Sequence, residues 1–293
     1  MTLYLAIDIG GTKIATGLVT PKGHVLKAAR VPTPLTGGSF ILDAALGLAR
    51  EMLAEQVVTA IGIGTGGQVD AARGVVVSTT DLLPGWAGTD VAEEFREAFG
   101  LPCFVDNDVN ALAVGEARLG AGRGKSSVLF LALGTGVGGA WVRDGKVHHG
   151  ATWTGGEFGH LYLTASADAP RQTLEDWASG PGLARTYLEL TGDAATGEEI
   201  ARAAALNPQS EAARAITRTG EALGFGLASL ANALDPELIV VGGGLASLGD
   251  LLLGPARAVL ARYGLPGPAR CPVVVASLGV EASLVGAACL AML

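Results

Sequence analysis

The segment Asp106-Asn107-Asp108-Val109-Asn110 holds four polar side chains in five residues, and its carboxylates are candidates for proton transfer. It lies between a predicted short strand, Cys103-Phe104-Val105, and an alanine-rich helix predicted over Asn110–Leu119. One interpretation is structural, because Asp and Asn side chains accept hydrogen bonds from the first free N–H groups of a helix. The other is catalytic, with a carboxylate at a strand end placed to take a proton from a substrate hydroxyl.

A second set of polar residues follows later in the chain, in Gly155-Gly156-Glu157-Phe158-Gly159-His160 and at Glu175. A single histidine beside apolar residues is usually structural, and an acid such as Glu175 is common in the first turn of a helix. These residues alone therefore leave a structural and a ligand-binding interpretation open.

Two glycine-rich turns indicate a ligand that carries phosphate. The apolar strand Leu3–Ile9 runs into Gly10-Gly11-Thr12, and the strand that begins at Val128 runs into Gly134-Thr135-Gly136. Backbone N–H groups without side chains can approach an anion closely, and a threonine hydroxyl adds a donor. Two such turns predict a divided nucleotide site. The polar segment at Asp106, between the two turns in the sequence, then favours the catalytic interpretation.

Two further glycine patterns imitate known nucleotide motifs. Gly134-x-Gly136-x-x-Gly139 has the spacing of a dinucleotide fingerprint, but that motif requires a helix after the glycines, and Ala140–Arg143 is typical of a strand. The segment Gly120–Ser126 resembles a P-loop, yet Leu119 stands where the motif needs glycine, and the segment leads from helix to strand. We interpret the latter as a turn between lobes.

Short strands alternate with segments of helical periodicity, which predicts α/β architecture with mostly parallel core strands and ligands beyond their carboxyl ends. The near repeat of the glycine-threonine turn suggests a duplicated fold whose halves meet around Glu116–Lys125. The predicted strands are Leu3–Ile9, Ile14–Thr20, Val25–Arg30, Val58–Gly64, Cys103–Val105, the run from Val128, the hairpin through Ala140–Val147, Leu238–Val241 and Val273–Ala276; the predicted helices are Phe40–Gln56, Val91–Phe99, Asn110–Leu119, Leu174–Thr191, Thr196–Ala205, Glu211–Leu234 and Glu281–Met292.

Composition excludes several classes of partner. The net charge of −8 and the absence of a long Lys/Arg cluster argue against nucleic acid. The longest charge-free run, Ser126–Val142, is interrupted by a glycine turn and is shorter than the ~20 apolar residues of a membrane span. No signal-peptide pattern precedes the first strand, so a cytoplasmic location is expected. Cys103, Cys271 and Cys289 are scattered, which is typical of reduced, buried thiols.

Taken in order, four motifs resemble the ROK family of sugar kinases. They are Asp8-Ile9-Gly10-Gly11-Thr12-Lys13, Asn107-Asp108-x-Asn110-Ala111, Leu133-Gly134-Thr135-Gly136-Val137-Gly138-Gly139 and Gly156-Glu157-x-Gly159-His160. Leu83-Pro84-Gly85-Trp86 and Ala178-Ser179-Gly180-Pro181 are similar to further segments of its bacterial glucokinases.

The resemblance implies the two-lobed actin-like ATPase fold, a ribonuclease H-like architecture of the hexokinase superfamily. It implies an N-terminal lobe over residues 1–118, a C-terminal lobe over 119–280 and a last helix over about 281–293 that packs back on the first lobe. Both lobes would close over sugar and ATP, and the family also implies a homodimer.

Residue by residue, the resemblance implies a role for each matching position. Asp108 matches the catalytic base, and Asn107 a ligand of sugar hydroxyls. The other matches are Glu157, His160 and Glu175 as readers of the hydroxyls near C1 and C2, Gly67 as a backbone contact to the sugar, Asp8 as the carboxylate near Mg²⁺, Gly10, Gly11, Thr12 and Lys13 in the first phosphate loop, Thr135 and Gly136 in the second, and Gly243 and Gly244 as the adenosine-side turn.

Two departures from the family pattern stand out. The usual G-x-P-G turn is here Gly64-Thr65-Gly66-Gly67, which loosens one backbone angle and leaves the contact possible. Most members carry a cysteine triad that binds zinc together with the histidine, but Leu161–Thr173 contains no cysteine. One histidine cannot hold a structural zinc, so we predict none, and we expect protein hydrogen bonds alone to orient His160.

The expected activity is therefore ATP-dependent phosphorylation of the 6-hydroxyl of a hexose, with glucose favoured. N-acetylmannosamine, N-acetylglucosamine, mannose or fructose remain alternative acceptors, and polyphosphate an alternative donor. A sugar-sensing regulator is a further alternative, although the family's repressors carry an amino-terminal DNA-binding domain and this chain starts at the first phosphate strand. A non-kinase ATPase of the same superfamily is also left open.

Overall fold

The computed structural model describes residues 2–54, 56–166 and 168–292, which form two compact units. Unit 1 consists of residues 2–124, 145–155 and 277–292, and unit 2 of residues 125–144 and 156–276. We expected the lobes to meet between residues 118 and 119. In the structure, unit 1 extends to residue 124 and also includes residues 145–155. Four positions lie outside the described residues. They are position 1 in the predicted first lobe, 55 in the first predicted helix, 167 in the cysteine-free segment and 293 in the last predicted helix.

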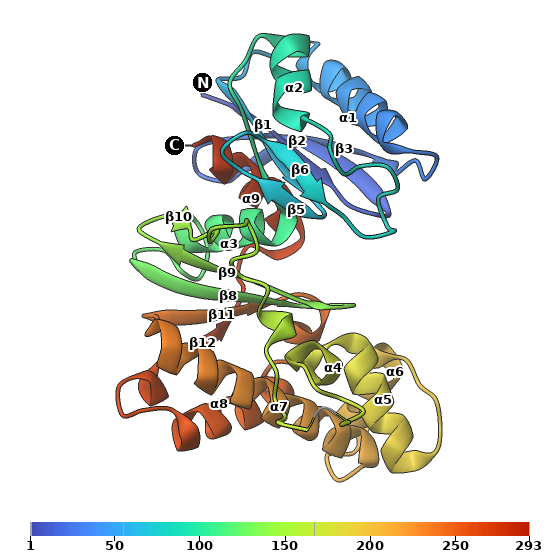
Figure 1. Ribbon diagram of the computed structural model, residues 1–293, viewed down its shortest axis with the longest axis vertical. Helices are drawn as coiled ribbons and strands as arrows, with labels where there is room; N and C mark the ends of the chain where they lie inside the picture. Colours follow the sequence, from blue (N-terminus) through green and yellow to red (C-terminus); the bar gives the residue numbers. More distant parts are fainter. Residues whose placement is uncertain (1, 55, 167, 293) are drawn as a thin grey trace. The chain divides into compact units, whose positions relative to one another are not determined.

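Unit 1 is built on a mixed sheet with the strand order β3-β2-β1-β4-β7 (Figure 1). Strands β1, β2 and β3 form an antiparallel meander, whereas β4 and β7 run parallel to β1. A short hairpin, β5 with β6, follows β4. The strands are β1 (Tyr4–Ile9), β2 (Lys13–Val19), β3 (Val25–Pro32), β4 (Ala60–Thr65), β5 (Gln68–Asp70), β6 (Val75–Ser78) and β7 (Cys103–Asn107). Strand β10 (Lys146–Val147) is not part of this sheet.

Helices cover both faces of this sheet. Helices α1 (Gly38–Leu53) and α2 (Val91–Phe99) share a core with Leu5, Ile7 and Ile9 of β1. On the other face, Ala6 packs with α9 (Ala282–Ala291), which also contacts α3 (Asp108–Arg118). Because successive side chains of a strand point to opposite faces, Asp8 shares the α9 face with Ala6.

Small residues allow α9 to approach its neighbours closely. A Cβ at Gly62 of β4 would lie 1.9 Å from the carbonyl oxygen of Ala287, and one at Gly286 would lie 2.4 Å from that of Ala111. Arg118 of α3 also donates through Nη1 to the carbonyl oxygens of Cys289 and Met292, each at 3.0 Å. The last described helix is therefore an integral part of unit 1.

Glu116 binds the backbone of unit 1 near residue 124, where the chain first leaves the unit, and near residue 277, where it last returns. Its side chain is 1% exposed. Oε1 accepts the backbone N–H groups of Ser277 and Leu278, each at 2.8 Å, and Oε2 accepts that of Ala121, also at 2.8 Å. Three backbone donors therefore satisfy this buried carboxylate and tie both segments to helix α3.

Unit 2 repeats the topology of unit 1. The sheet has the strand order β10-β9-β8-β11-β12, with β8 antiparallel to β9 and β11 parallel to both β8 and β12. The duplication suggested by the glycine-threonine turns is thus visible in strand order. The elements are β8 (Ser127–Leu133), β9 (Val137–Arg143), β11 (Leu238–Gly242), β12 (Val273–Val275), α4 (Leu174–Ala178), α5 (Gly180–Thr191), α6 (Gly197–Leu206), α7 (Glu211–Leu234) and α8 (Asp250–Tyr263).

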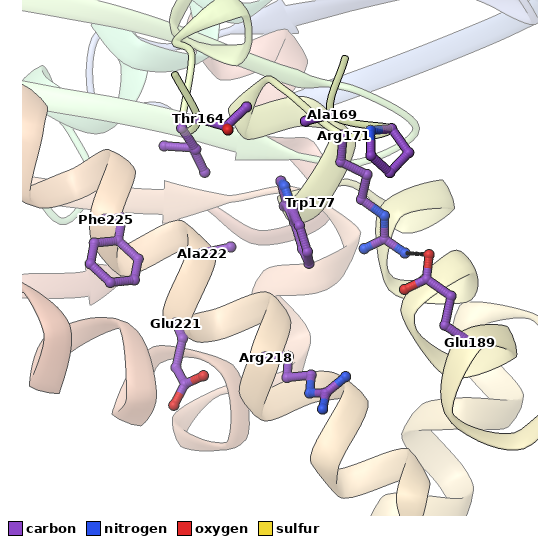
Figure 2. Close-up of a pocket in the computed structure, with 11 residues that line it drawn as sticks. Thr164, Ala169, Arg171, Trp177, Glu189, Arg218, Glu221, Ala222 and Phe225 are labelled. Carbon is purple, nitrogen blue, oxygen red and sulfur yellow. Dashed lines mark ion pairs between the residues drawn. The ribbon is translucent and has the colours of Figure 1, made fainter. Parts of the chain in front are cut away.

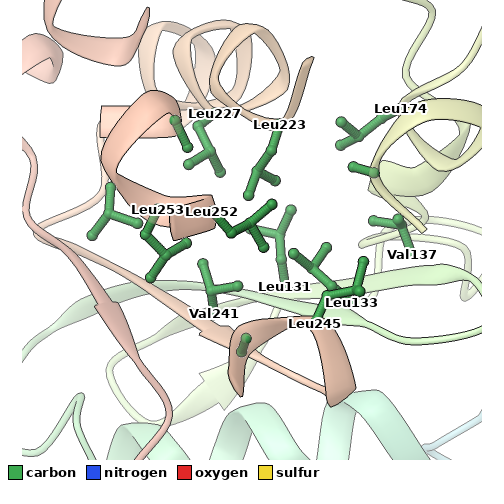
Figure 3. Packing of buried hydrophobic residues seen from close by; sticks show 14 of the residues in the cluster. Leu131, Leu133, Val137, Leu174, Leu223, Leu227, Val241, Leu245, Leu252 and Leu253 are labelled. Carbon is green, nitrogen blue, oxygen red and sulfur yellow. The ribbon is translucent and has the colours of Figure 1, made fainter. Parts of the chain in front are cut away.

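The core of unit 2 lies between the sheet and the helices, as Figure 3 shows. Leu131 and Val241 from adjacent strands meet Leu223 and Leu227 of α7 and Leu252 of α8, and all five are buried. These residues fill the space beneath the carboxyl ends of β8 and β11, so the turns that follow both strands rest on a packed base.

Two helix predictions in unit 2 needed correction. The helix predicted over Leu174–Thr191 is divided at Ser179, which has extended backbone and caps α5 by accepting the N–H of Gly182. Helix α8 was not predicted, because Pro255 inside it obscures the helical pattern. None of the helices that the structure describes is long and apolar enough to span a membrane.

Candidate functional site

In unit 1, three neighbouring parallel strands end at one edge of the sheet. Asp8 of β1 pairs with Gly64 of β4, and Gly64 pairs with Asp106 of β7. The first glycine turn, Gly67 and the Asn107-Asp108 pair therefore follow strand ends that lie side by side. Ligand sites in α/β folds occupy this position.

Asn107 is the residue that caps helix α3. Its Oδ1 accepts the N–H groups of Val109 at 2.9 Å and Asn110 at 3.3 Å, and its Nδ2 donates to the carbonyl oxygen of Gly67 at 2.9 Å. The structural interpretation of the polar segment thus holds for Asn107. Asp108 follows as the first residue of the helix, so its carboxylate is not needed as the cap.

Asp108 has the protonation properties of a general base. Burial, and to a lesser extent the charge of Asp8, raise the pKa of its carboxyl from 3.8 to about 6, against hydrogen bonds from Val109, its own N–H and Asn107. A carboxylate with a pKa of about 6 is ionised at neutral pH and still basic enough to take a proton.

Asp8 supplies the second carboxylate at this edge. Burial raises its pKa, while a hydrogen bond from Ser283 and the charge of Lys13 act in the opposite direction. Two carboxylates that repel each other across a strand end fit a divalent cation such as Mg²⁺, which binds one or two carboxylates together with substrate phosphates. No group of three or more metal-binding side chains occurs in the part of the chain that the structure describes.

Backbone contacts hold the first glycine turn between β1 and β2. The N–H of Gly10 donates to the carbonyl oxygen of Lys13 at 3.0 Å, and Thr33 Oγ1 donates to that of Gly10 at 2.6 Å. Thr33 also donates its N–H to Thr12 at 3.1 Å. Thr12 and Lys13 themselves are exposed, so their side chains remain accessible to a ligand.

Gly67 stands where only glycine fits. Its φ of +100° is a left-handed value, and a Cβ there would lie 2.5 Å from the carbonyl oxygen of Ser78. The carbonyl oxygen of Gly67 accepts the amide N–H of Asn107. The Gly64–Gly67 turn therefore holds Asn107, which is predicted to bind sugar hydroxyls, even without the family's proline.

Asp106 and His149 form a pair that sequence reasoning missed in part. Asp106 was recognised only as a member of a polar segment, and His149 was not singled out. His149 Nε2 lies 2.7 Å from Asp106 Oδ2. Burial acts to lower the pKa of His149, but the hydrogen bond and charge of Asp106 outweigh it, and the pKa is raised above 6.5.

In unit 2, Glu175 contacts the second glycine turn directly. Its Oε2 accepts the N–H of Val137 at 2.8 Å. The same turn receives the N–H of Gly180, the first residue of α5, on the carbonyl oxygen of Gly134 at 2.7 Å. The turn that carries Thr135 is therefore hydrogen-bonded to Glu175, which is predicted to bind the sugar.

Glu157 precedes the short 3-10 helix Phe158–His160 and His160 is its last residue, and both residues are exposed. The N–H of His160 donates to the carbonyl oxygen of Glu157 at 3.1 Å. The expectation that protein hydrogen bonds orient the His160 imidazole was wrong: within the described residues the structure gives this ring no hydrogen bond. The backbone places it, and the ring is accessible to a ligand.

The turn at Gly243-Gly244 lies beside the second glycine turn. Strands β8 and β11 are adjacent and parallel, and a Cβ at Gly243 would lie 2.4 Å from the carbonyl oxygen of Leu133. Gly243 has a φ of +84° and precedes the 3-10 helix Gly244–Leu248. The two turns predicted to serve phosphate and adenosine are thus neighbours.

A cavity of about 550 Å³ lies elsewhere in unit 2, among α4, α5, α7 and the cysteine-free segment (Figure 2). None of the predicted site residues lines it. In its wall, the Arg171 guanidinium lies 4.4 Å from the centre of the Trp177 ring, pairs with Glu189 at 2.8 Å and donates to Thr186 Oγ1 at 2.7 Å. We infer that these contacts anchor the cysteine-free segment.

The structure brings the predicted residues together in two sets. Unit 1 gathers the residues predicted to serve as the base, the carboxylate near Mg²⁺, the sugar contacts and the first phosphate loop: Asp8, Gly10, Gly11, Thr12, Lys13, Gly67, Asn107 and Asp108. Unit 2 gathers Thr135, Gly136 and Glu175 around one turn, with Gly243 and Gly244 next to it and Glu157 and His160 on a neighbouring 3-10 helix.

Several known proteins are similar to this chain over nearly its whole length. Glucokinase of Streptomyces coelicolor is 35% identical over 320 residues, covering 99% of this chain and 98% of that protein. N-acetyl-D-glucosamine kinase of Vibrio atlanticus is 31% identical over 288 residues, covering 93% and 94%. A crystal structure of a ROK family glucokinase from Streptomyces griseus in complex with glucose and AMPPNP has a TM-score of 0.80 at 33% identity, covering 98% of each chain.

These similarities confirm the predicted two-lobed actin-like ATPase fold, which the ROK sugar kinases share. The sequence model of the ROK family matches residues 4–293, nearly the whole chain. The protein belongs to the ROK family.

Proposed function

We propose that this protein transfers the γ-phosphoryl group of ATP to the 6-hydroxyl of a hexose, with glucose as the favoured acceptor. The observation that carries the proposal is Asp108: a half-buried carboxylate with a pKa of about 6, directly after the end of β7 and beside the fixed amide of Asn107. The similarity to sugar kinases from end to end of the chain supports it.

In the proposed mechanism Asp108 accepts the proton of the acceptor hydroxyl while that oxygen attacks the γ-phosphorus. The bond to the ADP oxygen breaks, so the products are a hexose 6-phosphate and ADP. Asn107, Glu157, His160 and Glu175 bind the other hydroxyls and orient the sugar. A general base is typically worth ~10²–10⁴ in rate, and positioning and electrostatic stabilisation supply the rest.

The phosphates of ATP are assigned to the two glycine turns. The N–H groups around Gly10–Thr12 and Thr135-Gly136 bind phosphate oxygens, and Gly243-Gly244 lies on the adenosine side. Asp8 faces the Mg²⁺ that accompanies ATP as part of the substrate. When bound, Mg²⁺ neutralises charge on the phosphate oxygens.

A panel of hexoses tests the proposal and its alternatives. Purified protein is assayed with glucose, mannose, fructose, N-acetylglucosamine and N-acetylmannosamine, each with ATP and with polyphosphate, by coupling to ADP release and by identifying the sugar phosphate. Glucose with ATP is expected to give the highest kcat/KM. Preference for another sugar would replace the acceptor, ATP hydrolysis without a sugar phosphate would indicate an ATPase, and sugar binding without turnover would indicate a sugar-sensing regulator.

The catalytic activity is expected to fall at acidic pH. Because the base must be ionised, kcat/KM should fall about tenfold per pH unit below an apparent pKa of about 6, the value that burial and Asp8 give Asp108. The measurement is kcat/KM for the preferred hexose between pH 4.5 and 8, with circular dichroism at each pH to verify folding. A profile that stays flat from pH 7 to pH 5 would contradict the assignment of the base.

Gly136→Ala tests the contact between Glu175 and the second glycine turn. The added Cβ would lie 2.6 Å from Glu175 Oε2, so the carboxylate must move and its bond to Val137 weakens. Losing one hydrogen bond to a charged group costs roughly 1.5 kcal/mol, which corresponds to about a tenfold rise in the hexose KM. Gly134→Ala is the matched control, because its Cβ would meet nothing within 4 Å. Equal KM values for the two variants would refute the coupling.

We also propose a cytoplasmic homodimer, on the strength of the family alone. Light scattering coupled to size-exclusion chromatography measures the mass directly. A mass close to that of one 29.4 kDa chain would refute the dimer.

A further inference from the structure

His149 and Asp106 form a polar pair with no part in the mechanism above. Asp106 is only 4% exposed, and each of its oxygens has a donor. Oδ1 accepts the N–H of Asn107 and the Nδ2 of Asn110, both at 2.8 Å, and Oδ2 lies 2.7 Å from His149 Nε2. His149 therefore satisfies the oxygen that the neighbouring backbone does not reach, as a buried carboxylate requires.

Through Asp106 this pair controls the point where β7 becomes α3. The contacts of Oδ1 fix the N–H of Asn107 and the side chain of Asn110, on either side of Asp108. Asn107 is held from its other end by Gly67. A rotation of the Asp106 carboxylate would disturb all of these bonds, and with them the direction in which Asp108 leaves the backbone.

His149 is itself held firmly. Its carbonyl oxygen accepts the N–H of Gly155 at 2.8 Å, and its ring meets Trp153 edge-on with centroids 5.4 Å apart. The same loop is anchored again where Gln68 Nε2 donates to the carbonyl oxygen of Thr152 at 2.5 Å. All of these residues belong to unit 1, and the chain runs on from Gly155 to the predicted sugar-reading Glu157.

We propose that His149 is a positioning residue for phosphoryl transfer, which acts by holding Asp106 so that Asn107 and Asp108 keep their places. The inference rests on the proposed kinase function. A displacement of about 1 Å in a reacting group can cost ~10²-fold in rate, and loss of an outer hydrogen-bond partner at a metal site typically costs ~10–100-fold. Hexose affinity depends on several hydroxyl contacts, so kcat should suffer more than hexose binding.

The test compares His149→Ala with His149→Gln, whose amide nitrogen can donate to Asp106 in place of Nε2. His149→Ala should lower kcat by ~10–100-fold with a smaller change in the hexose dissociation constant, and His149→Gln should stay within about threefold of wild type. His24→Gln, in the turn between β2 and β3, is the matched control and should be unchanged. A folded His149→Ala protein with normal kcat, or a glutamine variant as slow as the alanine variant, would overturn the proposal.

A double variant shows whether the effect passes through Asp106. His149→Ala added to Asp106→Asn should slow turnover no further than Asp106→Asn alone, because both changes break one chain of contacts. Additive losses would contradict this route. Hydrogen exchange gives a readout without catalysis: the amides of Asn107–Asn110 should exchange at least tenfold faster in His149→Ala. Unchanged protection would overturn the proposal even if wild type phosphorylates no hexose, an outcome that separately refutes the kinase function.

Discussion

Replacing Asp108 by asparagine is expected to lower kcat by ~10²–10⁴-fold while hexose binding stays within a few-fold of wild type. Asparagine has the same shape, and its Oδ1 can still accept the N–H of Val109, which Asp108 Oδ1 binds at 2.8 Å. It cannot take up a proton. The cap of α3 is also preserved, because that role belongs to Asn107. Only the chemical step should therefore be affected.

Two measurements separate the chemical step from binding. Steady-state assays give kcat, and isothermal titration calorimetry with the preferred hexose gives the dissociation constant. Asp90→Asn is the matched control, since Asp90 caps α2 by accepting the N–H of Glu93 at 3.0 Å, and asparagine caps helices equally well. If Asp108→Asn turns over as fast as Asp90→Asn, Asp108 is not the base.

The turns of the candidate site could be predicted from the sequence because their chemistry is local. A strand that runs into glycines and a threonine has few structural alternatives, and Gly10 and Thr135 lie in the turns that this pattern predicts. The glycine pattern continues past this turn, but Gly138 and Gly139 belong to β9, because a glycine can pair in a strand as well as turn. The two uses of glycine look alike in sequence.

Contacts between distant residues were beyond the reach of such patterns. The pairing of His149 with Asp106 joins positions 43 residues apart, and neither residue carries a motif of its own. Glu175 was recognised through family resemblance, yet its bond to Val137 depends on how α4 packs near β9. Local propensity predicts elements, whereas these bonds arise from tertiary packing.

The burial that raises the pKa of Asp108 should also lower the free energy of unfolding when its carboxyl group is ionised. This gives a second prediction for Asp108→Asn. The unfolded chain has a carboxyl pKa of 3.8 at this position, and the folded protein has a pKa of about 6. Between these values the folded state binds more protons than the unfolded state, so stability falls as pH rises through this window. Above this window, the folded protein retains the full cost of a partly buried charge that Asp8 repels.

Asparagine removes that charge, so the variant should be more stable than wild type at pH 8. The separation between 3.8 and about 6, at about 1.4 kcal/mol per pH unit, gives a gain of about 3 kcal/mol at most. The gain should shrink below pH 6 and vanish below pH 4.

Urea unfolding of both proteins at pH 8 and pH 5 measures this gain in stability, with Asp90→Asn as the control for a general effect of lost charge. A variant that is less stable than wild type at pH 8 would show that the Asp108 carboxylate stabilises the fold, which is incompatible with a pKa raised by burial and by Asp8. A catalytic group that weakens its own protein is the usual trade between stability and activity, and here one substitution should reveal both sides.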